Sequence, residues 1–122
     1  MTLNEYQKLC KLTAVKFKDR AKGSPSGEKE ILTWGLGIAG EAGDVAGCIK
    51  KTYCHNDDQT KGIKENLGDT MWYIAMICNF YGWSLEEVME GNIKKLEKRY
   101  PKGFFTYKHA RRNGRRKDWN ER

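Results

Sequence analysis

Apolar side chains recur at helical spacing in four successive segments, and this periodicity constrains the fold more than any other feature of the chain. The segments predict helices over residues 5–17, 28–51, 63–81 and 85–100. No alternating pattern bounded by turn residues competes with them as a strand signal. A chain of 122 residues can bury one core of its own. We therefore expect an all-α protein with an antiparallel, four-helix bundle-like protomer.

Capping and breaking residues mark the ends of these segments. Thr2 with Glu5, and Ser84 with Glu87, have the spacing of capping boxes at the start of the first and fourth helices. Gly82 predicts the end of the third helix, and Pro101 stops the fourth. The stretch "KGSPSG", residues 22–27, separates the first two helices.

The third predicted helix has two apolar stripes. One is a core stripe: Ile63, Leu67, Ile74, Cys78 and Tyr81. The other leads back to Asp69 at the same spacing: Tyr73, Met76 and Phe80. A helix that is apolar on both sides is expected to be buried on both sides, so we predict that a second subunit covers the second stripe, in a homodimer or a homotetramer.

Several classes of protein are excluded by what the sequence contains. No stretch approaches the ~18 apolar residues of a membrane span, and the start of the chain lacks a signal-peptide pattern, so we expect a cytoplasmic protein without membrane contact. The four cysteines form no CxxC pair, and there are two histidines. Neither a zinc site nor a disulfide framework is predicted.

The formal net charge of +7 is concentrated at the end of the chain. Seven basic and two acidic side chains between Lys108 and Arg122 give +5, which leaves +2 for residues 1–107. We expect a helical domain over residues 1–107 and a mobile basic tail over 108–122. The tail is either simply solvated or in contact with the phosphates of RNA, DNA or a bound nucleotide; we favour the former.

Five glycines interrupt the second predicted helix around two carboxylates. Gly35, Gly37, Gly40, Gly43 and Gly47 together cost on the order of 4–5 kcal/mol relative to alanine. Glu41 and Asp44 are three residues apart, so their carboxylates point the same way and repel unless a cation lies between them. A bare glycine surface beside such a pair suits a metal ion and its phosphate ligand, although a pair of solvated acids on an outer face is the plain alternative.

A second acidic group opens the third predicted helix. Glu65, Asn66 and Asp69 lie in its first turns, and we expect Asp69, which leads the second apolar stripe, to be partly buried. No basic side chain falls on that stripe to neutralise it. Mg²⁺ prefers oxygen ligands, and two antiparallel helices that each give acidic groups would provide them; Mn²⁺ is the alternative ion.

Three blocks of sequence, in order, carry a family resemblance: "GLGIAGEAGDVAGCIKK", "KENLGDTMWYIA" and "SLEEVMEGNIKKLEKRYPKGF". They resemble the MazG-like members of the all-α nucleoside triphosphate pyrophosphohydrolases, over roughly residues 2–104. The resemblance implies Mg²⁺-dependent hydrolysis of a (deoxy)nucleoside triphosphate to the monophosphate and pyrophosphate by an oligomer. It also implies metal ligands on facing helices.

The resemblance assigns those ligands to Glu41, Asp44, Asn66 and Asp69. Asn66 stands where the family has Glu, which removes one negative charge, and Glu65 beside it is a candidate substitute. Glu41 is the carboxylate that we expect to orient or deprotonate the attacking water.

Substrate contacts are expected from a further set of residues. Asn92 and Lys95 match the family's N-x-x-K and suit a sugar hydroxyl or a phosphate. The remaining candidates are basic side chains that would neutralise phosphate charge and two aromatics that could stack on a base: Lys50, Lys51, Arg99, Trp34 and Trp72. The rival hypothesis is a non-catalytic helical module that binds nucleic acid through the basic tail. The base, the sugar, the phosphorus attacked and the physiological role stay open.

Overall fold

The computed structural model describes residues 1–14 and 27–103. Over these residues the chain forms four α-helices and no strand, so the all-α prediction is confirmed. The helices are α1 (Leu3–Cys10), α2 (Glu28–Cys54), α3 (Thr60–Tyr81) and α4 (Leu85–Arg99), with a 3₁₀ turn, η1 (Lys11–Thr13), after α1. The chain divides into two compact units, Met1–Leu85 and Glu86–Arg122.

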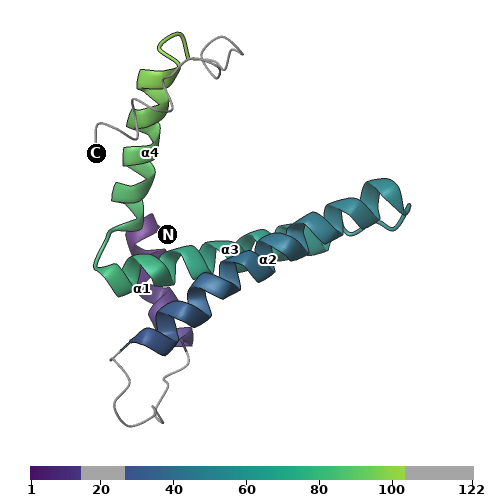
Figure 1. Cartoon of the computed structure of the whole chain (residues 1–122), viewed down its shortest axis with the longest axis horizontal. Coiled ribbons are helices and arrows are strands. Elements are labelled where there is room, and N and C mark those ends of the chain that lie inside the picture. Colours follow the sequence, from purple (N-terminus) through teal and green to yellow (C-terminus); the bar gives the residue numbers. More distant parts are fainter. Residues whose placement is uncertain (15–26, 104–122) are drawn as a thin grey trace. The chain divides into compact units, whose positions relative to one another are not determined.

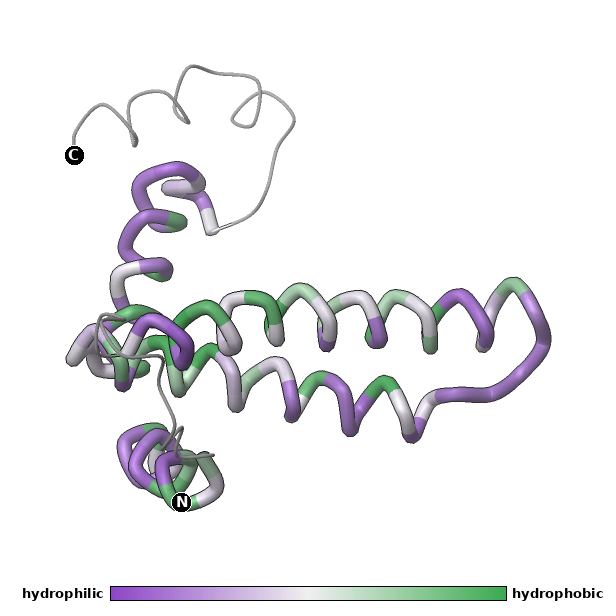
Figure 2. The backbone as a smooth tube through the Cα atoms, turned by 60° about the horizontal axis from the view of Figure 1, so that its bottom comes forward, coloured by the Kyte–Doolittle hydropathy of each residue, from purple (hydrophilic) through white to green (hydrophobic). Residues whose placement is uncertain are grey.

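α2 and α3 form a long antiparallel hairpin in the first unit (Figures 1 and 2). The two helices lie side by side because their facing surfaces interlock. The Tyr73 ring lies against Gly37, and the Cys48 thiol lies 3.1 Å from where a β-carbon at Gly62 would be. Residues 55–59 connect them, and the Gln59 N–H donates to the Thr52 hydroxyl across the connection (2.9 Å).

α1 begins with the predicted capping box. The Glu5 N–H donates to Thr2 Oγ1 and the Thr2 N–H donates to Glu5 Oε2, both at 3.1 Å. The helix ends earlier than its periodicity predicts, at Cys10, because Thr13 turns back to donate its hydroxyl to the Cys10 carbonyl (3.0 Å). Ala14 is already extended, and the rest of that predicted helix lies outside the described residues.

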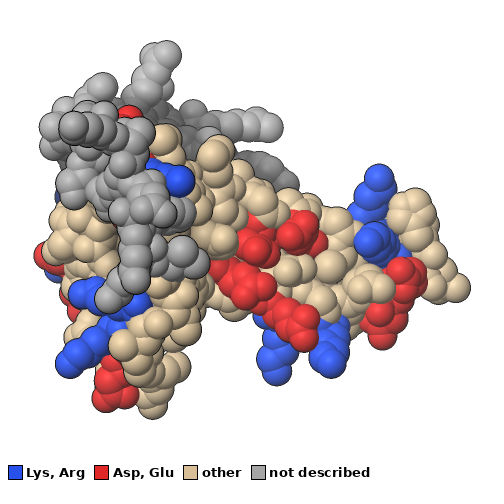
Figure 3. All heavy atoms as spheres, turned by 90° about the horizontal axis from the view of Figure 1, so that it is seen from below, with Lys and Arg blue, Asp and Glu red and all other residues tan. Residues whose placement is uncertain are grey.

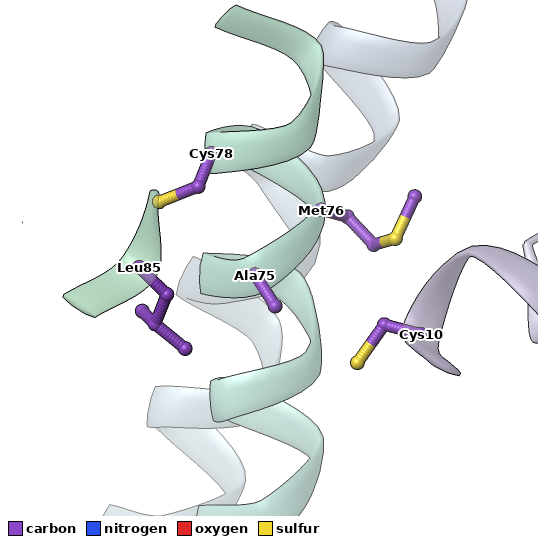
Figure 4. Close-up of a cluster of buried hydrophobic side chains, with 5 residues drawn as sticks. All are labelled: Cys10, Ala75, Met76, Cys78 and Leu85. Atoms are coloured by element: carbon purple, nitrogen blue, oxygen red, sulfur yellow. The ribbon is translucent and has the colours of Figure 1, made fainter. Parts of the chain in front are cut away.

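The core of the first unit gathers where α1, α3 and the start of α4 meet. Five side chains are almost fully buried: Cys10, Ala75, Met76, Cys78 and Leu85 (Figure 4). Beside them a buried glutamine links three segments. Gln7 donates to Asn79 Oδ1 (2.9 Å) and to the Trp83 carbonyl (2.8 Å), and its own Oε1 accepts the Leu85 N–H (2.7 Å).

The outer helix boundaries lie close to those predicted. α2 starts at Glu28 and runs three residues past Lys51, while α3 starts at Thr60, three residues before Ile63. Gly82 caps α3 in the left-handed region (φ 71°), which glycine enters without steric cost.

Both stripes of α3 contribute to the core of the first unit. Met76 is buried within the chain's own core, Tyr73 packs on Gly37, and Phe80 packs on Trp34. The second stripe is therefore covered largely by the chain itself. The predicted core stripe is divided: Cys78 is buried in the core and Ile74 packs against it, whereas Leu67 and Tyr81 are 52% and 51% exposed. α2 packs on the Tyr73 side of α3, where Gly37 leaves room for the ring.

The second unit begins at Glu86 and contains all of α4 except its first residue, Leu85. Glu86 and Glu87 lie in the first turn of α4, and Lys98 and Arg99 lie in its last turn. These charges complement the helix dipole. The predicted boundary between residues 107 and 108, and the basic tail, lie outside the described residues. None of the helices described here has the length and apolarity that crossing a membrane would require.

Candidate acidic site on the α2/α3 hairpin

Three carboxylates from α2 and α3 interact electrostatically midway along the hairpin. Burial and the negative charges of Asp69 and Asp44 raise the pKa of Glu41 above its ordinary value. Glu41 and Asp44 are one turn apart on α2, and Asp69 reaches them from α3. Figure 3 shows Asp and Glu side chains gathered on one face of the molecule, partway along the hairpin. The role of these carboxylates as metal ligands stays a prediction.

Asp69 is more open than we expected. It is exposed, whereas the sequence indicated partial burial on the aromatic stripe. The reason is that α1 crosses α3 further along, at Trp72, whose indole N–H donates to the Thr13 hydroxyl (2.8 Å). Asp69 lies one turn before that contact, beyond the cover that α1 provides.

A row of α2 residues connects Asp44 to a lysine. Gly40, Asp44, Gly47 and Lys51 follow one another at intervals of three or four residues, so they share one face of the helix. Lys51 lies two turns, about 10 Å, from Asp44 toward the loop end of the hairpin. Lys50 is roughly 100° further around the helix. A β-carbon at either of these glycines would meet no packed neighbour within 4 Å, so this face is bare on both sides of Asp44.

The donor chemistry of the site fits a hard divalent cation. Carboxylate oxygens are the ligands that Mg²⁺ takes in proteins, and the mutual repulsion that raises the pKa of Glu41 is what a cation would relieve. Within residues 1–14 and 27–103, however, no three His, Cys, Asp or Glu side chains already lie close enough to hold a metal ion together. Glu41 is half exposed and Asp44 and Asp69 are exposed, so their side chains are free to rotate toward a shared ion.

Asn66 and Glu65 differ in their surroundings. Asn66 is half-buried between the helices and donates its amide N–H to the Cys48 thiol (3.5 Å). Its side chain therefore faces α2, with the carbonyl oxygen as the atom that it could offer a metal ion. Glu65 is exposed on the other side of Asp69. Which of the two serves as the fourth ligand stays a prediction.

The two tryptophans proposed to stack on a base both make contacts within the protein. Trp34 meets Phe80 edge-on, with ring centroids 6.3 Å apart, and Trp72 meets Tyr73 edge-on at 5.1 Å. Both also pack against the buried core. Since each remains half exposed, a contact with substrate stays a prediction for both.

The remaining substrate-binding candidates lie on α4, in the second unit. Asn92 is exposed, whereas Lys95 and Arg99 are half-buried. Asn92 and Lys95 share a face of the helix, and Arg99 follows Lys95 on it after one turn. Their contribution to the acidic site stays a prediction.

One residue near the carboxylates escaped the sequence reasoning. Tyr6 lies in the first predicted helix, where the sequence analysis proposed no site residue. In the structure burial raises the pKa of Tyr6, and the Cys10 side chain and the negative charge of Asp69 add to the increase. No signal in the sequence could have found this neighbour, because the two residues are far apart in the chain and belong to different helices.

Comparison with known proteins places this arrangement in a family. The MazG nucleotide pyrophosphohydrolase domain matches residues 29–104, which is more than half of the chain and includes every carboxylate of the acidic site. The chain therefore belongs to the MazG family, as its three sequence blocks indicated.

Two relatives support the assignment without adding a measured activity. The chain is 33% identical over 73 residues to the gene 37 protein of Mycobacterium phage L5, an alignment that spans 56% of this chain and 64% of that protein. It is 31% identical over 70 residues to the uncharacterized protein YvdC of Bacillus subtilis (strain 168), across 49% and 66% of the two chains. The chain thus spans less than two thirds of the length of either relative. No solved structure matches it significantly.

Proposed function

We propose that this protein hydrolyses (deoxy)nucleoside triphosphates to the monophosphate and pyrophosphate, with Mg²⁺ as cofactor and Mn²⁺ as an alternative. The observation that carries the proposal is the electrostatic coupling of Glu41 with Asp44 and Asp69, across two helices. The family match, whose description is a nucleotide pyrophosphohydrolase domain, supports the same reaction class. Exposed carboxylates on a face without packed neighbours contribute little to folding, whereas phosphoryl transfer requires such groups to hold a metal ion.

Glu41, Asp44 and Asp69 would hold the metal ion, with Asn66 or Glu65 as a further oxygen donor. When bound, the ion supplies neutralisation of the phosphate charge and polarisation of the phosphorus centre. The carboxylates would thereby also fix the position of the triphosphate on the hairpin, since the nucleotide reaches an acidic surface only as a complex with a cation.

Glu41 is the residue that we assign to the attacking water. A carboxylate near the phosphorus can orient a water molecule, take one of its protons and so leave the oxygen lone pair directed at the phosphorus. Basic side chains, with Lys51 on the same face, would neutralise charge on the departing pyrophosphate.

We further propose that the protein works as a homodimer or a homotetramer, and that a second copy covers the face of the hairpin opposite the carboxylates. We call this the apolar face; it consists of Ile49, Tyr53, Ile63, Leu67 and Tyr81. Four of them are between 44% and 79% exposed, Ile63 being half-buried. Leu67 lies roughly 160° around α3 from Asp69, so association through this face leaves the acidic site open.

The rival hypothesis is a non-catalytic module that binds nucleic acid through residues 108–122. It rests on the +5 charge of that segment, which lies outside the described residues, whereas the pyrophosphohydrolase proposal rests on described carboxylates. A cytoplasmic location remains an expectation for either function.

One assay separates the two functions. The full chain is incubated with the ribo- and deoxyribonucleoside triphosphates and Mg²⁺, and pyrophosphate and orthophosphate are quantified separately. We expect pyrophosphate in equal amount to the monophosphate, and none after EDTA is added. Binding to DNA or RNA without pyrophosphate from any nucleotide would overturn the proposal.

A further inference from the structure

Asn66 stands where the family has a glutamate, and the two side chains present different atoms to a cation. A carboxylate has two equivalent oxygens, so either orientation of its plane turns an oxygen toward the ion. A primary amide has one oxygen and one NH₂ group, and a half-turn of its plane would direct N–H donors at the cation instead. An asparagine therefore serves as a metal ligand only if a neighbour holds its amide in one orientation.

Cys48 is such a neighbour. The Asn66 amide nitrogen donates to the Cys48 thiol across the hairpin (3.5 Å), and this is the bond that the amide makes among the described residues. The thiol is itself confined, because it lies 3.1 Å from where a β-carbon at Gly62 would be. Both Cys48 and Asn66 are half-buried between the helices. With the NH₂ group held by sulfur, the carbonyl oxygen is the end of the amide that is left for another partner.

Two packing contacts give the register of α2 against α3. The Tyr73 ring lies against Gly37, and the Cys48 thiol lies against Gly62. The two contacts are eleven residues apart on both helices, so the register does not shift between them. Positions that lie the same number of residues inward from the Cys48 contact are therefore level with one another across the hairpin.

This register brings Asn66 level with a carboxylate. Asp44 and Asn66 each lie four residues inward from the Cys48 contact, and Glu41 and Asp69 each lie seven residues inward. Asn66 thus has the thiol on its loop side, Asp44 opposite it, and the other two carboxylates on its far side. An amide whose nitrogen is held on the loop side has its oxygen available to the carboxylate cluster.

We propose that Cys48 is a positioning residue of the metal site: its thiol holds the Asn66 amide so that the carbonyl oxygen, rather than the NH₂ group, is offered to the metal ion. The inference rests on the proposed function, and it selects Asn66 over Glu65 as the further oxygen donor. Because sulfur is a weak acceptor and a poor ligand for Mg²⁺, the thiol can fix the amide without drawing the ion away from the oxygens.

The test measures Mn²⁺ binding to the full chain without nucleotide, through the loss of the electron paramagnetic resonance signal of the free ion. Cys48→Ala removes the acceptor and should weaken Mn²⁺ binding about tenfold, the lower end of the usual effect of losing the partner of a metal ligand. Cys48→Ser restores an acceptor and should keep most of the wild-type affinity. Cys54→Ala, the same change at an exposed position of α2, is the matched control and should bind as wild type does.

A double-mutant cycle separates positioning from a general effect on the fold. Asn66→Ala should weaken Mn²⁺ binding at least as much as Cys48→Ala does. In the Asn66→Ala background, Cys48→Ala should have no further effect, because no amide is left to orient. Glu65→Ala should change the affinity far less than Asn66→Ala. Equal weakening by Cys48→Ala in both backgrounds would show a merely structural role of the thiol and overturn the inference.

Pyrophosphate release by wild type with Mg²⁺ distinguishes this inference from the proposed function. If Cys48→Ala or Asn66→Ala binds Mn²⁺ as tightly as wild type, or if Cys48→Ser binds no better than Cys48→Ala, the inference is overturned while the proposed function stands. A wild-type protein that binds no Mn²⁺ also overturns the inference. One that in addition releases no pyrophosphate overturns the proposed function as well.

Discussion

The ring of Tyr73 on α3 occupies the space that a β-carbon at position 37 of α2 would take. Gly37 is therefore a packing residue: without it the two halves of the hairpin could not approach as closely as they do. This explains one of the five glycines that the sequence placed around the carboxylates. Gly40 and Gly47 have no such neighbour and remain bare beside Asp44.

Gly37→Ala should destabilise the protein, because the new methyl group meets the Tyr73 ring and forces the helices apart. Overpacking of this kind costs typically about 1–3 kcal/mol, more than the gain in helix propensity. The matched variant is Gly43→Ala, on the same helix with nothing within 4 Å, which should gain up to about 1 kcal/mol. Urea denaturation of both measures the difference. Equal effects would show that Tyr73 moves away at no cost.

Gln7→Ala should also lower the free energy of unfolding. It leaves the Leu85 N–H and Asn79 Oδ1 without their Gln7 partner, at a cost of about 1–3 kcal/mol for each such group that is buried. Gln59→Ala is the control, since the Gln59 amide bonds to Asp57 at an exposed position. Thermal denaturation should show a clear drop for Gln7→Ala alone; similar midpoints for both variants would contradict the role given to Gln7.

The carboxylate cluster should make stability depend on pH through Glu41. Its pKa is higher in the folded protein than the ordinary 4.5, so the folded state holds the proton more tightly. The contribution is complete below pH 4.5 and is lost as the pH rises through the raised folded value. Glu41→Gln removes the titrating group, so the variant should gain stability relative to wild type as the pH increases from about 4 to about 7. A constant difference across that range would show that Glu41 titrates normally.

If copies of the chain associate through the apolar face, the mass measured in solution should exceed that of one chain. Wild type should elute and scatter light as at least twice the 14.1 kDa of one chain. Leu67→Glu places a charge on the apolar face and should shift the protein toward the monomer. Leu12→Glu, at a 79% exposed position on η1, is the control and should leave the mass unchanged. A wild-type mass of one chain at micromolar concentration would end the oligomer proposal.

The sequence predicted local structure well because local structure depends on near neighbours. The Thr2 and Glu5 capping box, the end of α3 at Gly82 and the span of α2 all follow from residues within a few positions of one another. Helical spacing also predicted that Glu41 and Asp44 share one face of α2.

The features that the sequence did not predict depend on contacts between residues that are far apart in the chain. An α3 with two apolar stripes fits α2 on either side, and the pairing of Tyr73 with Gly37 leaves Leu67 and Tyr81 exposed. The exposure of Asp69 depends in the same way on where α1 crosses α3, which the bond between Thr13 and Trp72 fixes.

The most direct test of the central claim, that the carboxylate cluster is the reaction centre, is the rate of pyrophosphate release by Glu41→Gln at saturating Mg²⁺ and nucleotide. Loss of a general base lowers a rate by about 10²–10⁴-fold, and we predict a decrease of that size in a variant that remains folded. Glu28→Gln, an exposed glutamate at the start of the same helix, should keep the wild-type rate. A Glu41→Gln protein that releases pyrophosphate as fast as wild type would contradict the account.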